Sequence, residues 1–417
     1  MVKNPIFLSS LVIAFLFYSG IAQVRERHPF VSLAEESQII SIEGVLSSNP
    51  VKTSLFSSSY KANLSVKKVF TEKGIFEARG EVTVFVPSEL AEAFYPGKLY
   101  SLGMKSSNGG FLLENGGIFS FDVAAVKTEG FSHSFVVRRG KSLGWSGNRI
   151  MRKIKFFRAL CRLQFKRLMY AWGKAGGLLL ALLSGSREYT EKSVSDAFRD
   201  SGLSHILALS GMHLGLFGSI ANFFGKKARG RNFGDAIQLG AVCFFVWFAG
   251  ISPSLFRAFL AALILYLNSL FRMNRPDSIS LLCLCFILHF LVFPEHIQDA
   301  AFMLSYSSLT GIIIFSKMFK KVYPVFVPHK LRMSLSDSSA AQLSTAPVSL
   351  RFFGKIAPQG IIATVFVSPL VFLFLYIGLF GVIICLLLPF LSGPISAIMN
   401  ALYLLIKKFV FFFSFNI

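Results

Sequence analysis

Long apolar stretches follow one another through the second half of the chain, separated by short polar segments. Eight of them are predicted to be membrane-spanning helices: residues 204–224, 236–251, 254–271, 278–293, 299–316, 359–376, 378–392 and 395–415. Several are shorter than the roughly 20 residues that usually cross a bilayer, which predicts tilted, broken or re-entrant segments. Residues 176–184 are too few to cross and are expected to dip into the membrane or to pack inside the protein. Residues 176–417 are therefore predicted to form a polytopic α-helical membrane domain.

The first apolar stretch, residues 5–22, has two interpretations. Its length suits an uncleaved transmembrane anchor within residues 1–24, or a signal peptide cleaved after the triplet Gly20-Ile21-Ala22. The anchor is favoured, because the rest of the chain is already expected to be bound to the membrane.

Residues 30–140 change to the alternation of apolar and polar residues that is typical of β-strands. Glycine, proline, serine and asparagine bound the alternating runs. The predicted strands are Ile39–Leu46, Ala62–Val69, Gly80–Pro87, Gly97–Gly103 and Gly117–Val126. So many short strands in one segment favour a soluble all-β domain, for which an OB-like barrel is the best fit.

Residues 149–175 predict a basic amphipathic helix outside the bilayer. Its apolar residues recur at steps of three and four and form one stripe: Ile150, Ile154, Phe157, Cys161, Phe165, Leu168 and Trp172. Lysines and arginines surround this stripe, and the segment has no acidic residue. Such a helix either lies on anionic lipid headgroups or forms a basic rim that gathers the phosphates of a nucleic acid, and both can hold together. The residues expected on this face are Arg152, Lys155, Arg162, Lys166 and Arg167.

Composition and charge agree with a membrane protein. The 417 residues are 53% hydrophobic and include 47 phenylalanines, and the net charge is +22. Residues 1–140 are nearly balanced, with 14 basic and 12 acidic residues, whereas residues 141–417 hold 29 basic and 9 acidic ones. The positive charge thus belongs to the membrane half. The five cysteines all lie outside residues 30–140, so no disulfide framework is predicted there.

The basic loops predict an orientation. Residues 226–231, 272–275 and 317–332 are basic, whereas the alternate turns at 251–253 and 294–299 are not. Placing basic loops in the cytoplasm puts the N-terminus inside and residues 30–203 outside.

One apolar stretch carries unusual polar chemistry. The segment Ser204–Leu214 includes His205, Ser210, Gly211 and His213. Polar groups are costly in hydrocarbon, so these side chains either bond across a helix interface or line a path through the protein. Two alternatives are weaker. His205 and His213 lie about 12 Å apart along a straight helix, so they share a metal only if the helix breaks at Gly211. Ser210 and His213 resemble a nucleophile and its base, but the sequence supplies no orienting group.

The same region resembles a known family. The run Phe198–Leu203 followed by His205–His213 is similar to the signature of ComEC-type competence proteins, membrane channels that admit single-stranded DNA. A Pro-Ser-x-x-Arg-Ala element at Pro253–Ala258 and weaker blocks after Asp299 and Ser339 resemble the same family. Met303 and Tyr306 depart from its usual residues, and residues 363–369 lack its asparagine. By this resemblance the path residues are His205, Ser210, Gly211, His213 and Arg257, and the structural motif residues are Gly202, Pro253, Asp299, Ser305, Gln342 and Pro347.

The resemblance implies import of single-stranded DNA across the cytoplasmic membrane during natural transformation, without a cofactor, a metal or catalysis. It implies lipids, a DNA receptor, a cytoplasmic helicase-like motor and a separate nuclease as partners. Many relatives continue into a metallo-β-lactamase-like domain, whose His-x-His-x-Asp-His motif this sequence lacks, so nuclease activity is not carried over. The alternatives are a small-solute or ion transporter, an intramembrane hydrolase, and a truncated, inactive remnant.

Overall fold

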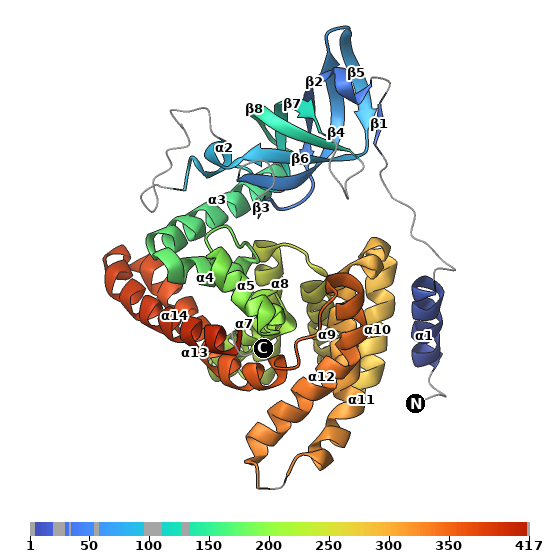
Figure 1. Cartoon of the computed structure of the whole chain (residues 1–417), viewed down its shortest axis with the longest axis vertical. Helices are drawn as coiled ribbons and strands as arrows, with labels where there is room; N and C mark the ends of the chain where they lie inside the picture. The colour runs from blue at the N-terminus through green and yellow to red at the C-terminus, as the bar shows by residue number, and fades with distance from the viewer. Residues whose placement is uncertain are drawn as a thin grey trace.

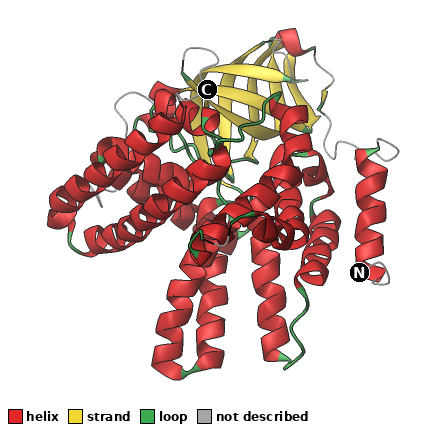
Figure 2. Ribbon diagram, turned by 60° about the horizontal axis from the view of Figure 1, so that its bottom comes forward, coloured by secondary structure: helices red, strands yellow, loops and turns green. Residues whose placement is uncertain are grey.

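The computed structural model describes residues 5–19, 30–32, 35–53, 58–95, 111–126, 133–324 and 326–414. A region of β-strands sits at one end, and helices fill the rest of the molecule (Figures 1 and 2). The long helix α3, Arg149–Ala171, leads from the strands into the helices.

The strand region is built around a closed ring of pairings. The ring consists of β2 (Ile39–Leu46), β4 (Ser59–Thr71), β6 (Glu81–Pro87), β8 (Ser134–Trp145) and β7 (Gly117–Ala125), which pairs with β2 again. Only the β6–β8 pair within this ring is parallel. The short strands β1 (Val31–Ser32), β3 (Val51–Thr53) and β5 (Gly74–Arg79), with helices η1 (Glu36–Gln38) and α2 (Ser88–Glu92), complete the region. Alternate side chains of β2, β4 and β6 are buried in its core, as the sequence pattern predicts.

Four of the five predicted strands are present, and Gly97–Gly103 lies outside the described residues. The strands β1, β3, β5 and β8 were not predicted from the alternation. In β8 the polar run Arg138-Arg139-Gly140-Lys141 interrupts the alternation, because that part of the strand faces solvent.

The helical part contains short helices as well as long ones. Its elements are α1 (Pro5–Tyr18), α4 (Gly173–Ser184), α5 (Lys192–Asp200), α6 (Ser204–Leu207), α7 (Gly211–Arg229), α8 (Arg231–Ala249), α9 (Pro253–Leu270), α10 (Ser278–Val292), η2 (Pro294–Gln298), α11 (Ala300–Val322), α12 (His329–Phe353), α13 (Gly360–Leu387), η3 (Pro389–Leu391) and α14 (Ser392–Ser414). Helix α4 packs in the largest apolar core, with α13 and α14 around it, which confirms that residues 176–184 pack inside the protein. Helix α1 lies beside α10, where Phe17 contacts Phe290.

Five of the described helices are long and apolar enough to cross a membrane. They lie within residues 232–249, 253–270, 300–322, 360–387 and 389–414. The separate spans predicted at 359–376 and 378–392 are wrong, because α13 runs through both. Gly378 does not interrupt this helix but lets it approach α4: a Cβ there would lie 2.7 Å from a methyl group of Leu179. Part of the predicted basic loop 317–332 is helical, and the serine-rich helix α12 was not predicted as an element.

Candidate functional site

The predicted span 204–224 is two helices with a break between them. Helix α6 ends at Leu207, and α7 begins at Gly211. Ser210 is the N-cap of α7 in extended conformation. Its backbone N–H donates to His213 Nδ1 over 3.2 Å, and its Oγ lies 3.1 Å from the same nitrogen. The Ser-x-x-His spacing therefore works as a reciprocal helix cap, with histidine in the place that Glu or Gln usually takes.

His213 is buried, with 1% of its surface exposed. Since Nδ1 accepts a hydrogen bond from the Ser210 backbone, the neutral ring carries its proton on Nε2. That Nε2 has no hydrogen-bond partner among the described residues. Because no described carboxylate orients this ring, the Ser210–His213 pair lacks the third member of a hydrolytic triad.

His205 does not join this group. It is exposed on α6, on the other side of the break, and has no polar contact with His213 in the described ranges. Those ranges also hold no cluster of three His, Cys, Asp or Glu side chains placed for a metal ion.

Arg257 comes to the break from a neighbouring helix. Proline at the first position of α9 places Arg257 on its second turn, half-buried. Its Nη1 donates to the Ser305 carbonyl oxygen of α11 over 2.5 Å. A Cβ on Gly211 would lie 3.3 Å from Arg257 Nη2 and 3.2 Å from the Ala258 Cβ, so glycine allows α9 to approach the start of α7. The structure thus gathers four of the five predicted path residues: Ser210, Gly211, His213 and Arg257.

The predicted motif residues occupy structural positions at helix ends, within helices and in one loop contact. Gly202 has φ +74° and packs against Ala357 and against Gly360, the first residue of α13. Gln342 Nε2 donates to the Ala357 carbonyl over 2.6 Å, so α12 fastens the same loop. The others are Pro253 at the start of α9, Asp299 at the N-cap of α11, Ser305 on α11 and Pro347 within α12.

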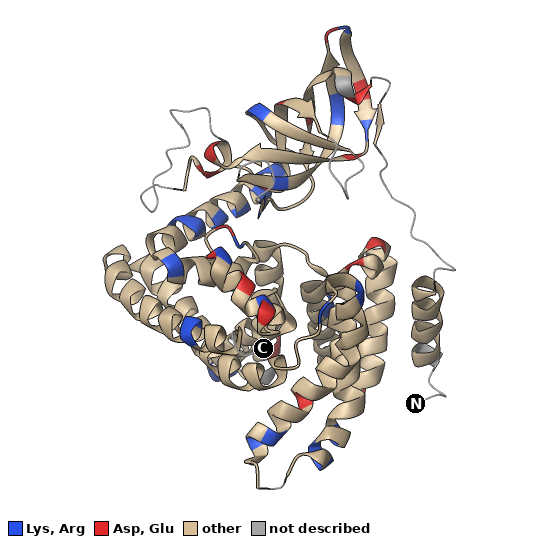
Figure 3. Ribbon diagram, in the orientation of Figure 1, with Lys and Arg blue, Asp and Glu red and all other residues tan. Residues whose placement is uncertain are grey.

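The basic helix needs a correction. Arg152 is exposed, and Lys155 is half-buried and donates to Ser146 Oγ over 2.7 Å. Arg162, Lys166 and Arg167 were expected on the same outer face, but they are 3%, 2% and 4% exposed. They cannot form a surface rim, because most residues of α3 from Ala159 to Met169 are buried. Figure 3 shows that this helix runs between the strand region and the other helices.

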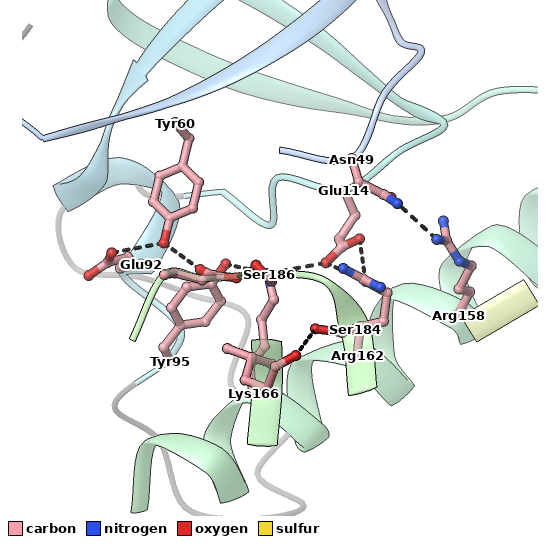
Figure 4. A network of polar contacts seen from close by, with 12 residues as sticks. Asn49, Tyr60, Glu92, Tyr95, Glu114, Arg158, Arg162, Lys166, Ser184 and Ser186 are labelled. Carbon is pink, nitrogen blue, oxygen red and sulfur yellow. Dashed lines mark hydrogen bonds and ion pairs between the residues drawn. The ribbon is translucent and has the colours of Figure 1, made fainter. Parts of the chain in front are cut away.

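Two buried carboxylates, which the sequence pattern did not predict, neutralise Arg162 and Lys166. Arg162 Nε lies 2.9 Å from an oxygen of Glu114, and Lys166 Nζ lies 2.9 Å from Glu188 and 3.5 Å from Glu114 (Figure 4). Arg167 instead donates to the Phe94 carbonyl over 3.0 Å. Arg162 and Lys166 thus serve as counter-ions of the two buried carboxylates, because a buried charge is costly unless it is paired.

Hydroxyl groups complete the network. The Tyr60 hydroxyl contacts Glu188 and Glu92, Ser186 donates to Glu188 over 2.6 Å, and Lys166 donates to the Tyr95 hydroxyl over 2.8 Å. Burial raises the pKa of Glu188, but the Lys166 ammonium and the Ser186 and Tyr60 hydroxyls outweigh it and hold this pKa below its usual value. Burial likewise raises the pKa of Glu114, and Arg162 and Lys166 bring it below normal.

The same helix also binds the end of α8. Arg158 Nε donates to the Trp247 carbonyl over 2.6 Å, and Arg162 Nη1 donates to the Phe248 carbonyl over 2.8 Å. These carbonyls belong to the last turn of α8, where cations satisfy unpaired acceptors and the helix dipole. Arg158 Nη2 also contacts Asn49 of the strand region over 3.2 Å. Helix α3 therefore joins the strand region to the helices through its cations.

Comparison with known proteins covers the break and the helices around it. The family described as Competence protein matches residues 182–415, more than half of the chain. The chain belongs to the Competence protein family. The matched range contains α6, α7, Arg257 and all six motif residues, whereas the strand region and all of α3 precede it.

Two curated relatives are similar over part of their length. ComE operon protein 3 of Bacillus subtilis (strain 168) is 30% identical over 184 residues, which are 43% of this chain and 23% of that protein. An uncharacterized protein of Aquifex aeolicus (strain VF5) is 29% identical over 237 residues, 56% of this chain and 53% of that one. The matches thus span about half or less of these relatives. No solved structure matches the chain.

Proposed function

We propose that this protein forms a channel that imports single-stranded DNA across the cytoplasmic membrane during natural transformation. The main support for the proposal is that Arg257 lies beside the helix break at Ser210–Gly211. Both lie in the part of the chain that the Competence protein family matches. A guanidinium beside a helix N-terminus is a favourable site for the phosphates of an anionic chain. Among apolar helices such a charge is costly unless it has a function of this kind.

The geometry supports a phosphate contact at this point. The N-terminus of α7 carries a partial positive charge, and its capping box holds Ser210 and His213 in place there. Arg257 is held on one side by the Ser305 carbonyl, so its Nη2 stays next to Gly211. His213 Nε2 adds one donor without a partner among the described residues. Each of these contacts with a passing phosphate has to be weak, because tight capture at one site would stop transport.

The strand region suits a role in receiving DNA. Its ring of five paired strands, with one parallel pair, supports the OB-like assignment. Domains of this kind hold single strands on aromatic and basic surfaces. With Arg162, Lys166 and Arg167 buried, the receiving surface reduces to the exposed start of α3 around Arg152 and Lys155.

We place the chain in the inner membrane with its N-terminus in the cytoplasm and residues 30–203 outside. A DNA receptor would deliver the strand from outside, a separate nuclease would remove the complementary strand, and a cytoplasmic helicase-like motor would draw the strand inward.

Photo-crosslinking tests the proposed path. Benzoylphenylalanine replaces Ala208, which is exposed within the break, or Leu404, which is 62% exposed on α14. Labelled single-stranded DNA should crosslink during uptake at position 208 and not at 404, and Arg257→Gln should reduce the yield severalfold. Equal yields at the two positions, or none at 208 in cells that take up DNA normally, would contradict the path.

A further inference from the structure

The hairpin of α11 and α12 projects from the bundle and ends in a basic tip (Figures 1 and 3). Helix α11 ends at Val322, and α12 begins at His329. Between Asp299 and Asp337 the sequence has no acidic residue but five lysines and arginines: Lys317, Lys320, Lys321, Lys330 and Arg332. Both arms of the hairpin contribute to this cluster, which we call the basic tip.

The charges of the basic tip are not neutralised by the part of the chain that the structure describes. No ion pair joins any of the five residues to a carboxylate among the described residues. Lys320 Nζ instead lies 3.3 Å from His329 Nε2, which holds the two arms together. Arg332 Nε is buried and has no hydrogen-bond partner in the described ranges. An anion at this tip would therefore meet several cations, and the hairpin between Asp299 and Asp337 has no acidic residue to compete with it.

Apolar side chains lie directly beside these cations. Phe326 is 86% exposed and Val322 is 69% exposed. A groove of about 430 Å³ runs between the hairpin and α13, and its lining is apolar apart from one tyrosine hydroxyl. Its walls include Tyr323, Val327, Leu331, Leu335, Ile362 and Val365.

The position of the tip relative to the membrane follows from its helices. Both α11 and α13 are long and apolar enough to span a bilayer. Lys317, Lys320 and Lys321 lie in the last two turns of α11, and Lys330 and Arg332 lie in the first turn of α12. The basic tip therefore reaches the level of the lipid headgroups while the groove faces the acyl chains. Lysine beside exposed aromatic and aliphatic side chains is the usual composition at that level.

We infer that the basic tip and its groove bind an anionic phospholipid, with one acyl chain in the groove and the phosphate among Lys320, Lys321 and Lys330. A nucleic acid or an acidic protein surface would also suit the cations, but either would leave Phe326 and the apolar groove in water. A lipid satisfies both features, and anionic headgroups favour basic residues at the cytoplasmic surface. The inference does not depend on DNA transport.

Lipid binding to the purified full chain tests the inference. Native mass spectrometry of the chain in detergent measures the occupancy by dioleoylphosphatidylglycerol and by dioleoylphosphatidylcholine. The variant Lys320→Gln/Lys321→Gln/Lys330→Gln removes three charges, and each is worth about fivefold in affinity. We expect a preference for phosphatidylglycerol that falls on the order of a hundredfold in this variant. Substituting the same three lysines by arginine should preserve the preference.

Two further variants separate the tip from general charge effects. Lys67→Gln/Lys68→Gln/Lys73→Gln removes three exposed lysines from the strand region and should leave lipid occupancy unchanged. Ile362→Trp fills the groove and should lower the occupancy by both lipids without altering any charge. Equal binding of the two lipids by the wild type, or an unchanged preference in the tip variant, would overturn the inference. Displacement of the bound lipid by a short oligonucleotide would assign the tip to nucleic acid instead.

Discussion

The substitution Lys166→Met probes the buried charge network most sharply. The Lys166 side chain is 2% exposed, and its Nζ lies 2.9 Å from Glu188. Removing it leaves Glu188 buried with hydroxyl partners only, whereas Glu114 keeps Arg162 at 2.9 Å. Leaving one buried charge without its partner costs about 3–5 kcal/mol of the free energy of unfolding. The exposed Lys153→Met, on the same helix, should cost at most about 0.5 kcal/mol.

A double variant separates charge from shape. Lys166→Met/Glu188→Gln removes both charges and keeps both volumes, so it should recover more than half of the loss. Guanidinium unfolding of the full chain in detergent, followed by tryptophan fluorescence, measures all the variants, because Trp172 is buried at the end of α3. A loss below about 1 kcal/mol for Lys166→Met would refute the reasoning. Lys166 would then face solvent, and an outer basic rim would again be plausible for DNA.

Three further predictions concern the stability of the folded chain. The pKa values of the two buried carboxylates lie below the unfolded value of about 4.3, so their contribution to stability is complete above that pH and is lost as the pH falls through the folded values; an unfolding midpoint that stays constant from pH 6 to pH 3 would contradict this. Gly202→Ala should destabilise by about 2–4 kcal/mol, because φ is +74° and backbone atoms lie 3.0 Å from the new Cβ, whereas Gly173→Ala, with φ +63° and open space, should cost about 1 kcal/mol; equal losses in denaturant unfolding would disprove the packing argument. Trp172→Phe removes a 3.0 Å hydrogen bond from Nε1 to Ser392 Oγ and should lower the free energy of unfolding by about 1–2 kcal/mol beyond the loss from the smaller ring. Ser392→Ala removes the same bond and should show a similar loss of about 1–2 kcal/mol. Thermal unfolding that neither change affects would show that the bond does not contribute.

The sequence pattern was sufficient to predict those elements whose formation depends on residues that are neighbours in sequence. The alternation in Ile39–Leu46 defines β2 to the residue, and Asn148 caps α3 directly before its predicted start. The structure breaks the helix directly before Gly211, the residue at which a break was considered from the sequence, and this glycine also lets α9 come close.

The buried network could not be predicted in this way. A helical projection of α3 shows a basic surface around an apolar stripe, but it cannot show which cations another element will cover. The acidic partners, Glu114 and Glu188, come from two loops on either side of α3. One available signal was the composition of residues 159–169, which are apolar over most of their length and predict enclosure on more than one side.

The errors among the helices have a similar cause. Helix α12 is rich in serine and has too little hydropathy to suggest a membrane element, but it packs along α11, where Ser344 donates to the Ser307 carbonyl over 2.8 Å. Such polar contacts between helices leave no periodic trace in one sequence.

DNA uptake in cells tests the central claim most directly. Naturally transformable cells that carry this gene would be compared after its deletion and after its restoration as wild type, Arg257→Gln or Arg275→Gln, with labelled DNA scored once it resists external nuclease. Arg275 is an exposed residue in a loop away from the break and serves as the matched control. The account predicts that deletion abolishes protected DNA, that wild type and Arg275→Gln restore it, and that Arg257→Gln at equal abundance does not. Unchanged uptake after deletion would contradict the channel.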